Sequence, residues 1–463
     1  MNDKAKPPVH KGQIIKLNIH SVNHDGEGVG RFEGFTVFVP GTAPGEIVSA
    51  SVISLQKSYA RALLGSVLQR SPARVAPRCA HYEACGGCQL QHIDYAEQLK
   101  LKQHAVQDAL KRIGGLDTPV LPTIGMSDPW HYRNKAQVPV GLEGSEVRAG
   151  FYEKRSHKIV DLKCCHIQHS TNDYVVHTVR RALQELAIPI YHEQSHTGLV
   201  RHVMARTSFT TGEVLVVIVT NGRTLPKANK LTDMLREAID GLSGIVQNIN
   251  TRSGNVILGN EDTTLWGRPY LTETLSELKF QVSPRSFFQV NPIQTEALYN
   301  KAKEYSALTG KETVFDLYCG IGTISLFLAR SAAKMVGVES VEQAVLDAAK
   351  NAELNKLTNV EFHTGLAEVV VPRLFKAGYH ADVVVVDPPR KGCDEKLLAT
   401  TVAMQPARIV YVSCNPATLA RDLKYLTANG YQTAEVQPVD MFPHTSHVEA
   451  IILMTRSGSG DKK

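Results

Sequence analysis

The chain has 463 residues, 43% of them hydrophobic and 21% charged, and a formal net charge of +6. This length exceeds one ordinary hydrophobic core, so we expect two or three domains, and the mild positive charge is compatible with a polyanionic partner. The sequence has no apolar run near the roughly 20 residues that a membrane span needs and no apolar signal segment at its start, which predicts a cytoplasmic protein without membrane association.

The first part of the chain alternates apolar and polar residues over short stretches. Strands are predicted at residues 13–19, 36–39 and 47–54, and glycine-rich turns at 25–30 and 40–45. Several short strands with closely spaced turns are typical of a small β-barrel. We therefore expect a barrel domain over residues 1–70, followed by a linker that contains proline.

Five of the eight cysteines lie in the next region, residues 71–277. Cys79, Cys85 and Cys88 come close together, and the adjacent Cys164 and Cys165 follow far downstream. In a cytoplasmic chain, clustered cysteines favour a metal site over disulfides. Zinc and a [4Fe-4S] cluster both accept four cysteine thiolates, and the spacing alone does not distinguish them.

Helical and strand patterns organise the rest of the chain. A helical stretch at 94–113 and strand patterns at 214–220 and 244–250 predict a mixed α/β central domain. From residue 278 onward, strands and helices alternate regularly, which predicts a doubly wound parallel sheet over residues 278–463. Its strands are expected at 314–317, 334–338, 359–363, 381–386 and 408–413.

A nucleotide-binding pattern follows the first strand of this sheet. Asp316 precedes a Gly-x-Gly turn formed by Gly320 and Gly322, and Glu339 ends the next strand. Glycines let the backbone approach a ligand, and an acid at the second strand end can accept hydrogen bonds from ribose hydroxyls. The turn lacks the full Gly-x-Gly-x-x-Gly pattern of dinucleotide sites, which favours a cofactor without phosphates, such as S-adenosylmethionine.

Two further strands of the sheet end in reactive groups. One ends at Asp387-Pro-Pro-Arg390, and another ends at Cys414, directly before Asn415-Pro416. In open α/β sheets the chemistry gathers at the carboxyl ends of the strands. A lone cysteine after a strand is more often a small buried core residue. The neighbouring acidic strand end favours a nucleophile instead.

These residues resemble a known family. Asp387-Pro-Pro-Arg-Lys-Gly392, followed after sixteen residues by Ile409-Val-Tyr-Val-Ser-Cys414-Asn-Pro-Ala-Thr418, resembles one signature of the RNA (uracil-5-)-methyltransferases, and Asp440-Met-Phe-Pro-His-Thr-Ser-His447-Val-Glu449 resembles their second. Phe287-Phe-Gln289-Val-Asn291 is similar to the segment before their cofactor domain. The N-terminal region resembles the TRAM domain, an OB-like RNA-binding barrel. The cysteine segment resembles the iron–sulfur site of the 23S ribosomal RNA branch.

The resemblance implies a Rossmann-like methyltransferase domain, S-adenosylmethionine and a [4Fe-4S] cluster as cofactors, 23S ribosomal RNA as partner, and no obligate protein partner. It implies Cys414 as nucleophile, Glu449 as base, a cofactor site at Gln289, Tyr318, Glu339 and Asp387, and cluster ligands at Cys79, Cys85, Cys88 and Cys165. Cys165 is preferred to Cys164 because Cys165-His-Ile-Gln matches the family segment better. The gap of five residues after Cys79 departs from the Cys-x3-Cys-x2-Cys pattern of radical enzymes, so we expect a structural or RNA-positioning cluster.

The expected reaction explains why these residue types are needed. C5 of uracil is a poor nucleophile, and addition of a thiolate to C6 moves electron density onto C5, which can then accept a methyl group. A free cysteine has a pKa of about 8.5 and needs help to ionise, which a cationic cofactor or Arg390 could give. A carboxylate can then remove the C5 proton. The target uridine must be unstacked to be reached.

Three alternatives remain at the level of sequence. The nearest is a transfer-RNA uridine methyltransferase; the barrel and the cysteines favour the ribosomal branch, because the transfer-RNA enzymes of the family typically lack both. A nicotinamide-dependent oxidoreductase would use the Gly-x-Gly turn but leaves Cys414 and Glu449 unexplained. A non-enzymatic RNA-binding iron–sulfur protein would not need Cys414.

Overall fold

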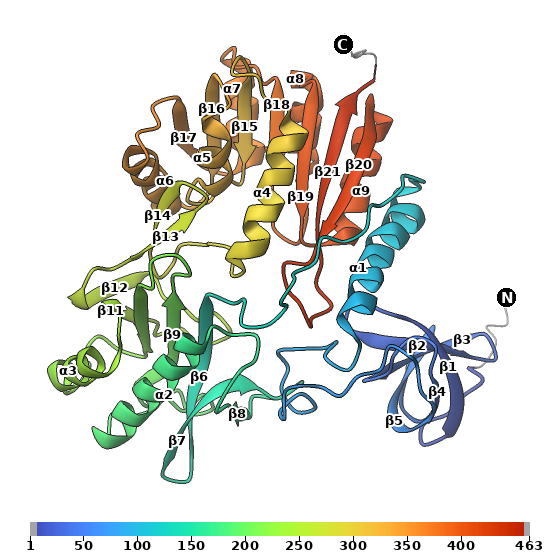
Figure 1. The fold of residues 1–463 in the computed structure, drawn as a ribbon, viewed down its shortest axis with the longest axis vertical. Helices are drawn as coiled ribbons and strands as arrows, with labels where there is room; N and C mark the ends of the chain where they lie inside the picture. Colours follow the sequence, from blue (N-terminus) through green and yellow to red (C-terminus); the bar gives the residue numbers. More distant parts are fainter. Residues whose placement is uncertain (1–6, 458–463) are drawn as a thin grey trace.

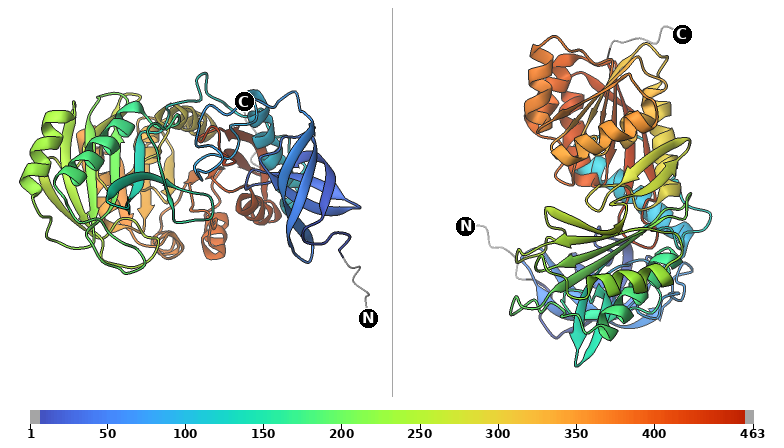
Figure 2. Two further views of the ribbon diagram at one scale, coloured as in Figure 1. Left: turned by 90° about the horizontal axis from the view of Figure 1, so that it is seen from below. Right: turned by 90° about the vertical axis from the view of Figure 1, so that its left-hand side faces the viewer.

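The computed structural model describes residues 7–457, which form an N-terminal barrel, a central α/β region and a C-terminal sheet covered by helices (Figure 1). Figure 1 shows the C-terminal sheet in the upper half, with the central sheet and the barrel below it. Seen from below, the barrel and the central sheet lie at opposite ends of the molecule (Figure 2). Among residues 7–457, no helix is long and apolar enough to cross a membrane.

The N-terminal region is a closed five-stranded barrel, as predicted. Its strands, which follow one another around the barrel in the order β1-β2-β3-β5-β4, are β1 (Ile14–Val22), β2 (Glu27–Phe32), β3 (Phe35–Pro40), β4 (Ile47–Leu55) and β5 (Tyr59–Gln69). Alternate residues point inward, so that Leu17, Ile19, Val37 and Val48 form a dry core. Closure pairs every strand on both sides and removes the exposed edges of an open sheet.

The prediction of a turn over residues 25–30 is right for Asp25 and Gly26 and wrong for the rest, because β2 begins at Glu27. Gly28 serves close packing and not a bend. A Cβ atom on Gly28 would lie 1.9 Å from Thr42 Oγ1, so only glycine fits at this point of the barrel wall. The strand β5 was not predicted either.

The central region contains a mixed seven-stranded sheet with two helices on one face. The strand order is β12-β11-β10-β9-β6-β7-β8. The elements are β6 (Lys135–Glu143), β7 (Glu146–Tyr152), β8 (Ile159–Asp161), α2 (Ser170–Glu185), β9 (Val200–Thr207), β10 (Val214–Thr220), α3 (Ala228–Ala238), β11 (Leu242–Ile249) and β12 (Glu261–Gly267). Val175, Val179 and Leu183 of α2 pack on Val203 and Val216 of the sheet. The opposite face of the sheet therefore remains available to the C-terminal domain.

Three elements connect the regions. α1 (Tyr95–Ala109) continues into a wider π-helical turn, Leu110–Gly114, and packs against the C-terminal helix α9 and strand β20. The hairpin of β13 (Leu271–Leu275) and β14 (Leu278–Val282) precedes α4 (Pro292–Ser306). Phe280 of this hairpin is buried in one hydrophobic core together with residues of both the central and the C-terminal sheets. The two sheets therefore share apolar packing.

The C-terminal sheet also has seven strands, in the order β17-β16-β15-β18-β19-β21-β20. β15 to β19 are parallel, and β21 runs antiparallel between β19 and β20. The elements are β15 (Thr313–Leu317), α5 (Thr323–Ala329), β16 (Lys334–Glu339), α6 (Glu342–Leu354), β17 (Val360–Thr364), α7 (Ala367–Lys376), β18 (Val383–Val386), α8 (Glu395–Met404), β19 (Arg408–Ser413), α9 (Pro416–Ala428), β20 (Tyr431–Val439) and β21 (Glu449–Arg456). The strand order reverses between β15 and β18, and ligands of such sheets bind outside the carboxyl ends of the strands at that switch point.

Candidate active site

The loop after β15 begins the candidate site. Asp316 is fully buried; its Oδ2 accepts a hydrogen bond from Ser325 Oγ at 2.5 Å, and its Oδ1 has no partner within residues 7–457. Burial raises the pKa of this carboxyl to about 7. Tyr318 has a φ of 71°, a conformation that costs a non-glycine residue about 1–3 kcal/mol. A strained turn beside an unpartnered buried oxygen indicates a ligand site.

Glu339, at the end of β16, holds the glycine turn. Its carboxylate accepts hydrogen bonds from the backbone N–H of Gly320 at 3.2 Å and of Val341 at 2.8 Å. Gly320 and Gly322 both have positive φ, at 55° and 81°. The acid and the glycines that the sequence singled out therefore form one structural unit at the carboxyl ends of neighbouring strands.

Several acids face the hydroxyl of Tyr299, which lies on α4. The Tyr299 hydroxyl shares a hydrogen bond of 2.9 Å with Thr323 Oγ1. Burial, together with the negative charges of Asp387, Asp316 and Glu449, raises the pKa of Tyr299. Burial also raises the pKa of Asp387 to about 6. Acids that lie this close together disfavour one another's ionisation, because their negative charges repel. A cationic ligand is favoured beside them for the same reason.

Gln289 lies on the segment between β14 and α4 and is buried. Its backbone carbonyl accepts a hydrogen bond from Asn134 Nδ2 at 3.1 Å, and Asn134 N–H donates to Val290 O at 2.8 Å. The central sheet thus fixes the backbone of this segment directly. Asn291 then caps α4 by accepting a hydrogen bond from Gln294 N–H.

Cys414 and Glu449 lie on neighbouring strand ends. Cys414 directly follows β19, Glu449 begins β21, and the adjacent residues Ser413 and Ala450 are paired in the antiparallel ladder. Glu449 is buried, and no group among the described residues donates a hydrogen bond to its carboxylate. A carboxylate without donors keeps its capacity to accept a proton.

The electrostatic environment disfavours ionisation of both groups in the free protein. Burial raises the pKa of the Cys414 thiol to about 11, and the charges of Glu449 and Asp387 add to the effect. Burial and Asp387 also hold the pKa of Glu449 well above its usual range. The cation of Arg390 acts in the opposite direction on both groups. Arg390 is therefore close enough to assist ionisation of the thiol.

Cys414 opens into a cavity of about 200 Å³ built by three regions. Arg390 and His447 of the C-terminal domain line it, together with Lys102 of α1 and the barrel loop around His24. Ser446 Oγ donates a hydrogen bond of 2.7 Å to His24 O, which joins the barrel to the segment before β21. The thiol therefore faces a chamber at the junction of the barrel, α1 and the C-terminal sheet.

Residues that the sequence did not reveal hold the segment 440–449 in place. Asp440 accepts hydrogen bonds from Lys102 Nζ and from Tyr95 Oη, the latter at 2.8 Å. Trp130 stacks on His444 with 3.7 Å between ring centroids. Lys102 is one of several polar residues of α1, and nothing in the sequence identifies it as buried or names its partner.

The cysteines of the central region converge on a second cavity. Cys79, Cys85, Cys88, Cys164 and Cys165 all line a space of about 140 Å³. Cys79 and Cys165 pack against the apolar cluster that contains Cys88, whereas Cys164 is exposed. Burial raises the pKa of the Cys88 thiol to about 11 and that of Cys165 to about 12. Within residues 7–457, no group of three or more His, Cys, Asp or Glu side chains is arranged to hold a single metal ion.

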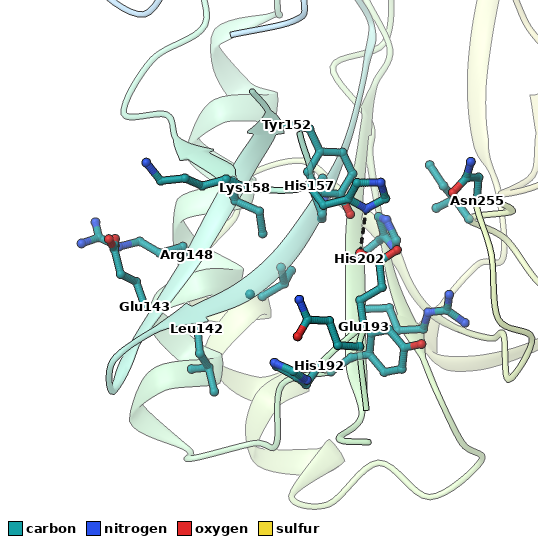
Figure 3. Close-up of a pocket in the computed structure, with 18 of the residues that line it drawn as sticks. Leu142, Glu143, Arg148, Tyr152, His157, Lys158, His192, Glu193, His202 and Asn255 are labelled. Carbon is teal, nitrogen blue, oxygen red and sulfur yellow. Dashed lines mark hydrogen bonds and ion pairs between the residues drawn. The ribbon is translucent and has the colours of Figure 1, made fainter. Parts of the chain in front are cut away.

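A larger cavity, of about 910 Å³, lies elsewhere, on β6, β7 and nearby loops of the central region (Figure 3). Its charged side chains pair with each other or with their neighbours. His157 Nδ1 contacts Glu193 Oε2 at 2.8 Å, and Arg148 Nε contacts Glu143 Oε2 at 3.2 Å. Cys414 and Glu449 do not line this cavity, so it is not the candidate active site.

Comparison with known proteins decides the family. Residues 94–457 match the profile of tRNA (uracil-5-)-methyltransferases, and residues 8–64 match that of the TRAM domain. The chain belongs to the tRNA (uracil-5-)-methyltransferase family. Its barrel is a TRAM domain, and its C-terminal domain has the methyltransferase fold. The chain is 49% identical over 452 residues to an uncharacterized RNA methyltransferase of Halalkalibacterium halodurans. The match covers 97% of this chain and 99% of that one.

Further relatives support the assignment. An uncharacterized RNA methyltransferase of Listeria monocytogenes is 50% identical over 444 residues, covering 96% of this chain and 98% of that one. The crystal structure of Pyrococcus abyssi tRNA (uracil-54, C5)-methyltransferase with S-adenosyl-L-homocysteine is similar with a TM-score of 0.76 and 29% identity, covering 95% of this methyltransferase and 100% of that chain. The 5% of this chain that the Pyrococcus abyssi structure does not cover is shorter than the barrel. A methyltransferase named for transfer RNA therefore matches at least part of the barrel. The barrel alone therefore does not distinguish the ribosomal from the transfer-RNA branch.

Proposed function

We propose that this methyltransferase transfers a methyl group from S-adenosylmethionine to C5 of a uridine in 23S ribosomal RNA, through a covalent bond between Cys414 and C6. The observation that carries the proposal is the position of Cys414 and Glu449 at adjacent strand ends, where Cys414 lines a chamber shared with the barrel. A thiol and an acid without hydrogen-bond donors, set side by side, suit addition followed by proton removal.

The proposed reaction uses two carbons of the uracil ring in turn. The Cys414 thiolate adds to C6, and the electron pair of the C5–C6 double bond moves toward the O4 carbonyl as an enolate. C5 then forms a bond to the methyl carbon as the methyl–sulfur bond of the cofactor breaks. Glu449 removes the proton that C5 still carries, the double bond reforms, and the thiolate leaves. Each residue therefore acts at a different carbon of the same ring.

Ionisation of both groups is disfavoured in the free protein, so binding of the substrates has to change the balance. S-adenosylmethionine supplies an electrophilic methyl group on a cationic sulfonium. A cation near Asp387 and Glu449 lowers their pKa values, because it stabilises the charged carboxylates. Arg390 favours the thiolate of Cys414 in the same way. The acid group thus suits a positively charged methyl donor.

We further propose that Gln289, Tyr318, Glu339 and Asp387 line the cofactor site. The strained turn at Tyr318, the glycines held by Glu339 and the position of Asp387 after β18 support this proposal. The turn and Asp387 flank the β15/β18 switch point of the sheet, where a nucleoside ligand is expected.

The cysteine cavity is proposed to hold a [4Fe-4S] cluster on Cys79, Cys85, Cys88 and Cys165. A single zinc ion needs thiolates about 3.8 Å apart, given a metal–sulfur distance of about 2.3 Å, whereas in a cubane each thiolate binds a separate iron. The cysteines that share one cavity can supply four thiolates, and the resemblance of their segment to the 23S branch favours the cluster over zinc. Cys165 is favoured over Cys164 because it is packed beside Cys79 and Cys88 and Cys164 is exposed.

Protein purified without oxygen tests the cluster. We expect a brown preparation with about four irons per chain, bound through four thiolates. Cys165→Ala should lose the iron and Cys164→Ala should keep it. Stoichiometric zinc without iron would refute the cluster.

Transfer RNA is the second candidate substrate, because the similar Pyrococcus abyssi structure is named a tRNA (uracil-54, C5)-methyltransferase. The resemblance of the cysteine segment to the 23S branch supports the ribosomal substrate instead. Mapping 5-methyluridine in ribosomal and transfer RNA, with and without the gene, separates the two. Loss of the modification from 23S RNA alone is expected.

RNA that carries 5-fluorouridine tests the covalent mechanism. Fluorine cannot leave C5 as a proton does, so the wild-type protein with S-adenosylmethionine should form a stable adduct. Cys414→Ala should form none, whereas Cys393→Ala, which changes a buried cysteine outside the candidate chamber, should still form it. An adduct that persisted in Cys414→Ala would refute the assignment of the nucleophile.

A further inference from the structure

Two cations without an acidic partner face each other on the central sheet. Lys135 of β6 is paired directly with Arg206 of β9 in the antiparallel ladder. Like charges directly opposite each other on neighbouring strands destabilise a sheet. A fold that places two cations there therefore calls for a compensating negative charge.

The charge of Arg206 is buried without compensation. Arg206 is 1% exposed, its Nη2 donates to Ser286 O at 3.2 Å, and its Nε and Nη1 have no partner within the described residues. The nearest acid, Glu273, acts on Arg206 only through space. Glu273 is engaged by three other donors, which are Ser208 Oγ at 2.9 Å, Thr210 Oγ1 at 2.7 Å and Phe209 N–H at 3.1 Å. A guanidinium with two unpartnered, buried N–H groups is a preformed anion receptor.

Lys135 is the more accessible member of the pair. Its side chain forms no hydrogen bond or ion pair with any described residue, and it is partly exposed. Arg133, two residues earlier, lines the cysteine cavity and adds further positive charge. Burial and these two arginines lower the pKa of Lys135 to about 7, which fits a lysine with no anion beside it.

The pair lies beside the segment that reaches the candidate active site. Arg206 contacts Ser286, and Asn134, which directly precedes β6, contacts Gln289. Asn291 of the same segment donates through Nδ2 to Met441 O at 3.1 Å, in the segment between β20 and Glu449. An anion bound by the pair would therefore be anchored to the backbone that supports the chemistry.

We propose that Lys135 and Arg206 bind one phosphodiester group of the RNA substrate, close to the target uridine, and so position that nucleotide. This inference rests on the proposed RNA methyltransferase function. The other available oxyanion is the carboxylate of S-adenosylmethionine. That molecule carries a net positive charge, because it has both an ammonium and a sulfonium group. Two uncompensated cations, Lys135 and Arg206, disfavour its binding beside them. RNA is a polyanion and suits the pair.

The first experiment measures RNA and cofactor binding separately. Lys135→Gln should weaken binding of the substrate RNA by roughly 10-fold to 100-fold, the range for a charged hydrogen bond, and should lower the slope of log affinity against log salt by about 1. Lys135→Arg should restore the slope. Affinity for S-adenosylmethionine should not change.

Lys376→Gln is the matched control. Lys376 is an exposed lysine in the last turn of α7, on the far part of the C-terminal domain, and its removal changes the net charge by the same amount (Figure 1). It should leave the salt slope as in wild type. Equal melting temperatures of the two variants would show that Lys135→Gln is folded.

The second experiment finds the phosphate. Substrate RNAs with a single neutral methylphosphonate linkage, moved stepwise past the target uridine, should include one that weakens binding to wild type and not to Lys135→Gln. The inference is overturned if every linkage affects both proteins equally, if the salt slope is unchanged in Lys135→Gln, or if only cofactor affinity falls. Failure of the proposed function is a separate result, since wild type would then form no fluorouridine adduct with any RNA.

Discussion

At the scale of single residues, the site combines a thiol and an acid whose ionisation is disfavoured in the free protein. Burial raises the pKa of Cys414 and of Glu449, and the nearby Asp387 raises them further. A nucleophile that ionises only when its substrates bind is protected against side reactions such as oxidation, because the thiolate is the reactive form. Arg390 is the group on the protein that opposes this effect.

Replacing Arg390 by glutamine should therefore make Cys414 less reactive. Loss of the cation raises the pKa of the thiol, so the pH profile of Cys414 alkylation by iodoacetamide should move to higher pH. Because Arg390 is exposed and its charge is screened, we expect the rate at pH 8 to fall only about twofold to fivefold. Mass spectrometry of the peptide containing Cys414 measures the rate. Arg373→Gln, on α7, should have no effect.

Glu449→Gln should separate the early steps from the last one. The variant should still add Cys414 to C6 and still transfer the methyl group, because the carboxylate acts afterwards. Release should slow by about 10²-fold to 10⁴-fold, the usual effect of removing a general base, so the adduct with ordinary RNA should accumulate on denaturing gels. Turnover at the wild-type rate without adduct would make the carboxylate structural.

The sequence predicted where these reactive residues would meet, and the reason is geometric. Asp316, Asp387 and Cys414 all follow or end apolar strand patterns, and the carboxyl ends of parallel strands share one edge of a sheet. The contacts between Lys102 and Asp440, and between Trp130 and His444, could not be predicted. They join residues more than three hundred positions apart, and no local pattern encodes such a pairing.

At the scale of elements, regular periodicity was a reliable guide and glycine was not. The strands β15, β16, β18 and β19 follow the predicted alternation of strands and helices, since their apolar runs are buried on both faces. In the barrel, Gly28 was interpreted as part of a turn although it lies within β2. The sequence cannot tell a glycine that bends the chain from one that makes room for a neighbour, here Thr42.

Gly28→Ala tests this explanation. The added methyl group would meet Thr42 Oγ1, so the barrel should lose about 1–3 kcal/mol of unfolding free energy, the usual effect of overpacking. Gly222→Ala is the control, because a Cβ atom there meets nothing closer than 3.6 Å. Hydrogen exchange of the barrel strands should quicken in the first variant only. Equal protection in both would show that the wall relaxes around the methyl group.

At the scale of the whole molecule, the candidate chamber exists only because three regions meet. The barrel contributes the loop around His24, α1 contributes Lys102, and the C-terminal domain contributes Cys414 and His447. The hydrogen bond from Ser446 to His24 joins the barrel loop to the C-terminal domain. The position of α1 also shapes the chamber, because Lys102 lines it.

The buried ion pair between Lys102 and Asp440 fixes that position, since both side chains are at most 2% exposed. Lys102→Met leaves the Asp440 charge buried with only Tyr95 as partner, and breaking a buried pair in this way costs about 3–5 kcal/mol. We expect α1 and the segment 440–449 to lose hydrogen-exchange protection together. Asp440→Asn should have a similar effect, because it leaves Lys102 charged or forces it to lose a proton.

The double variant should be less destabilised than the sum of the two single variants, because each charge is uncompensated only when the other is absent. Strictly additive losses would mean that the two charges do not stabilise each other and that apolar packing alone holds α1 against the C-terminal domain.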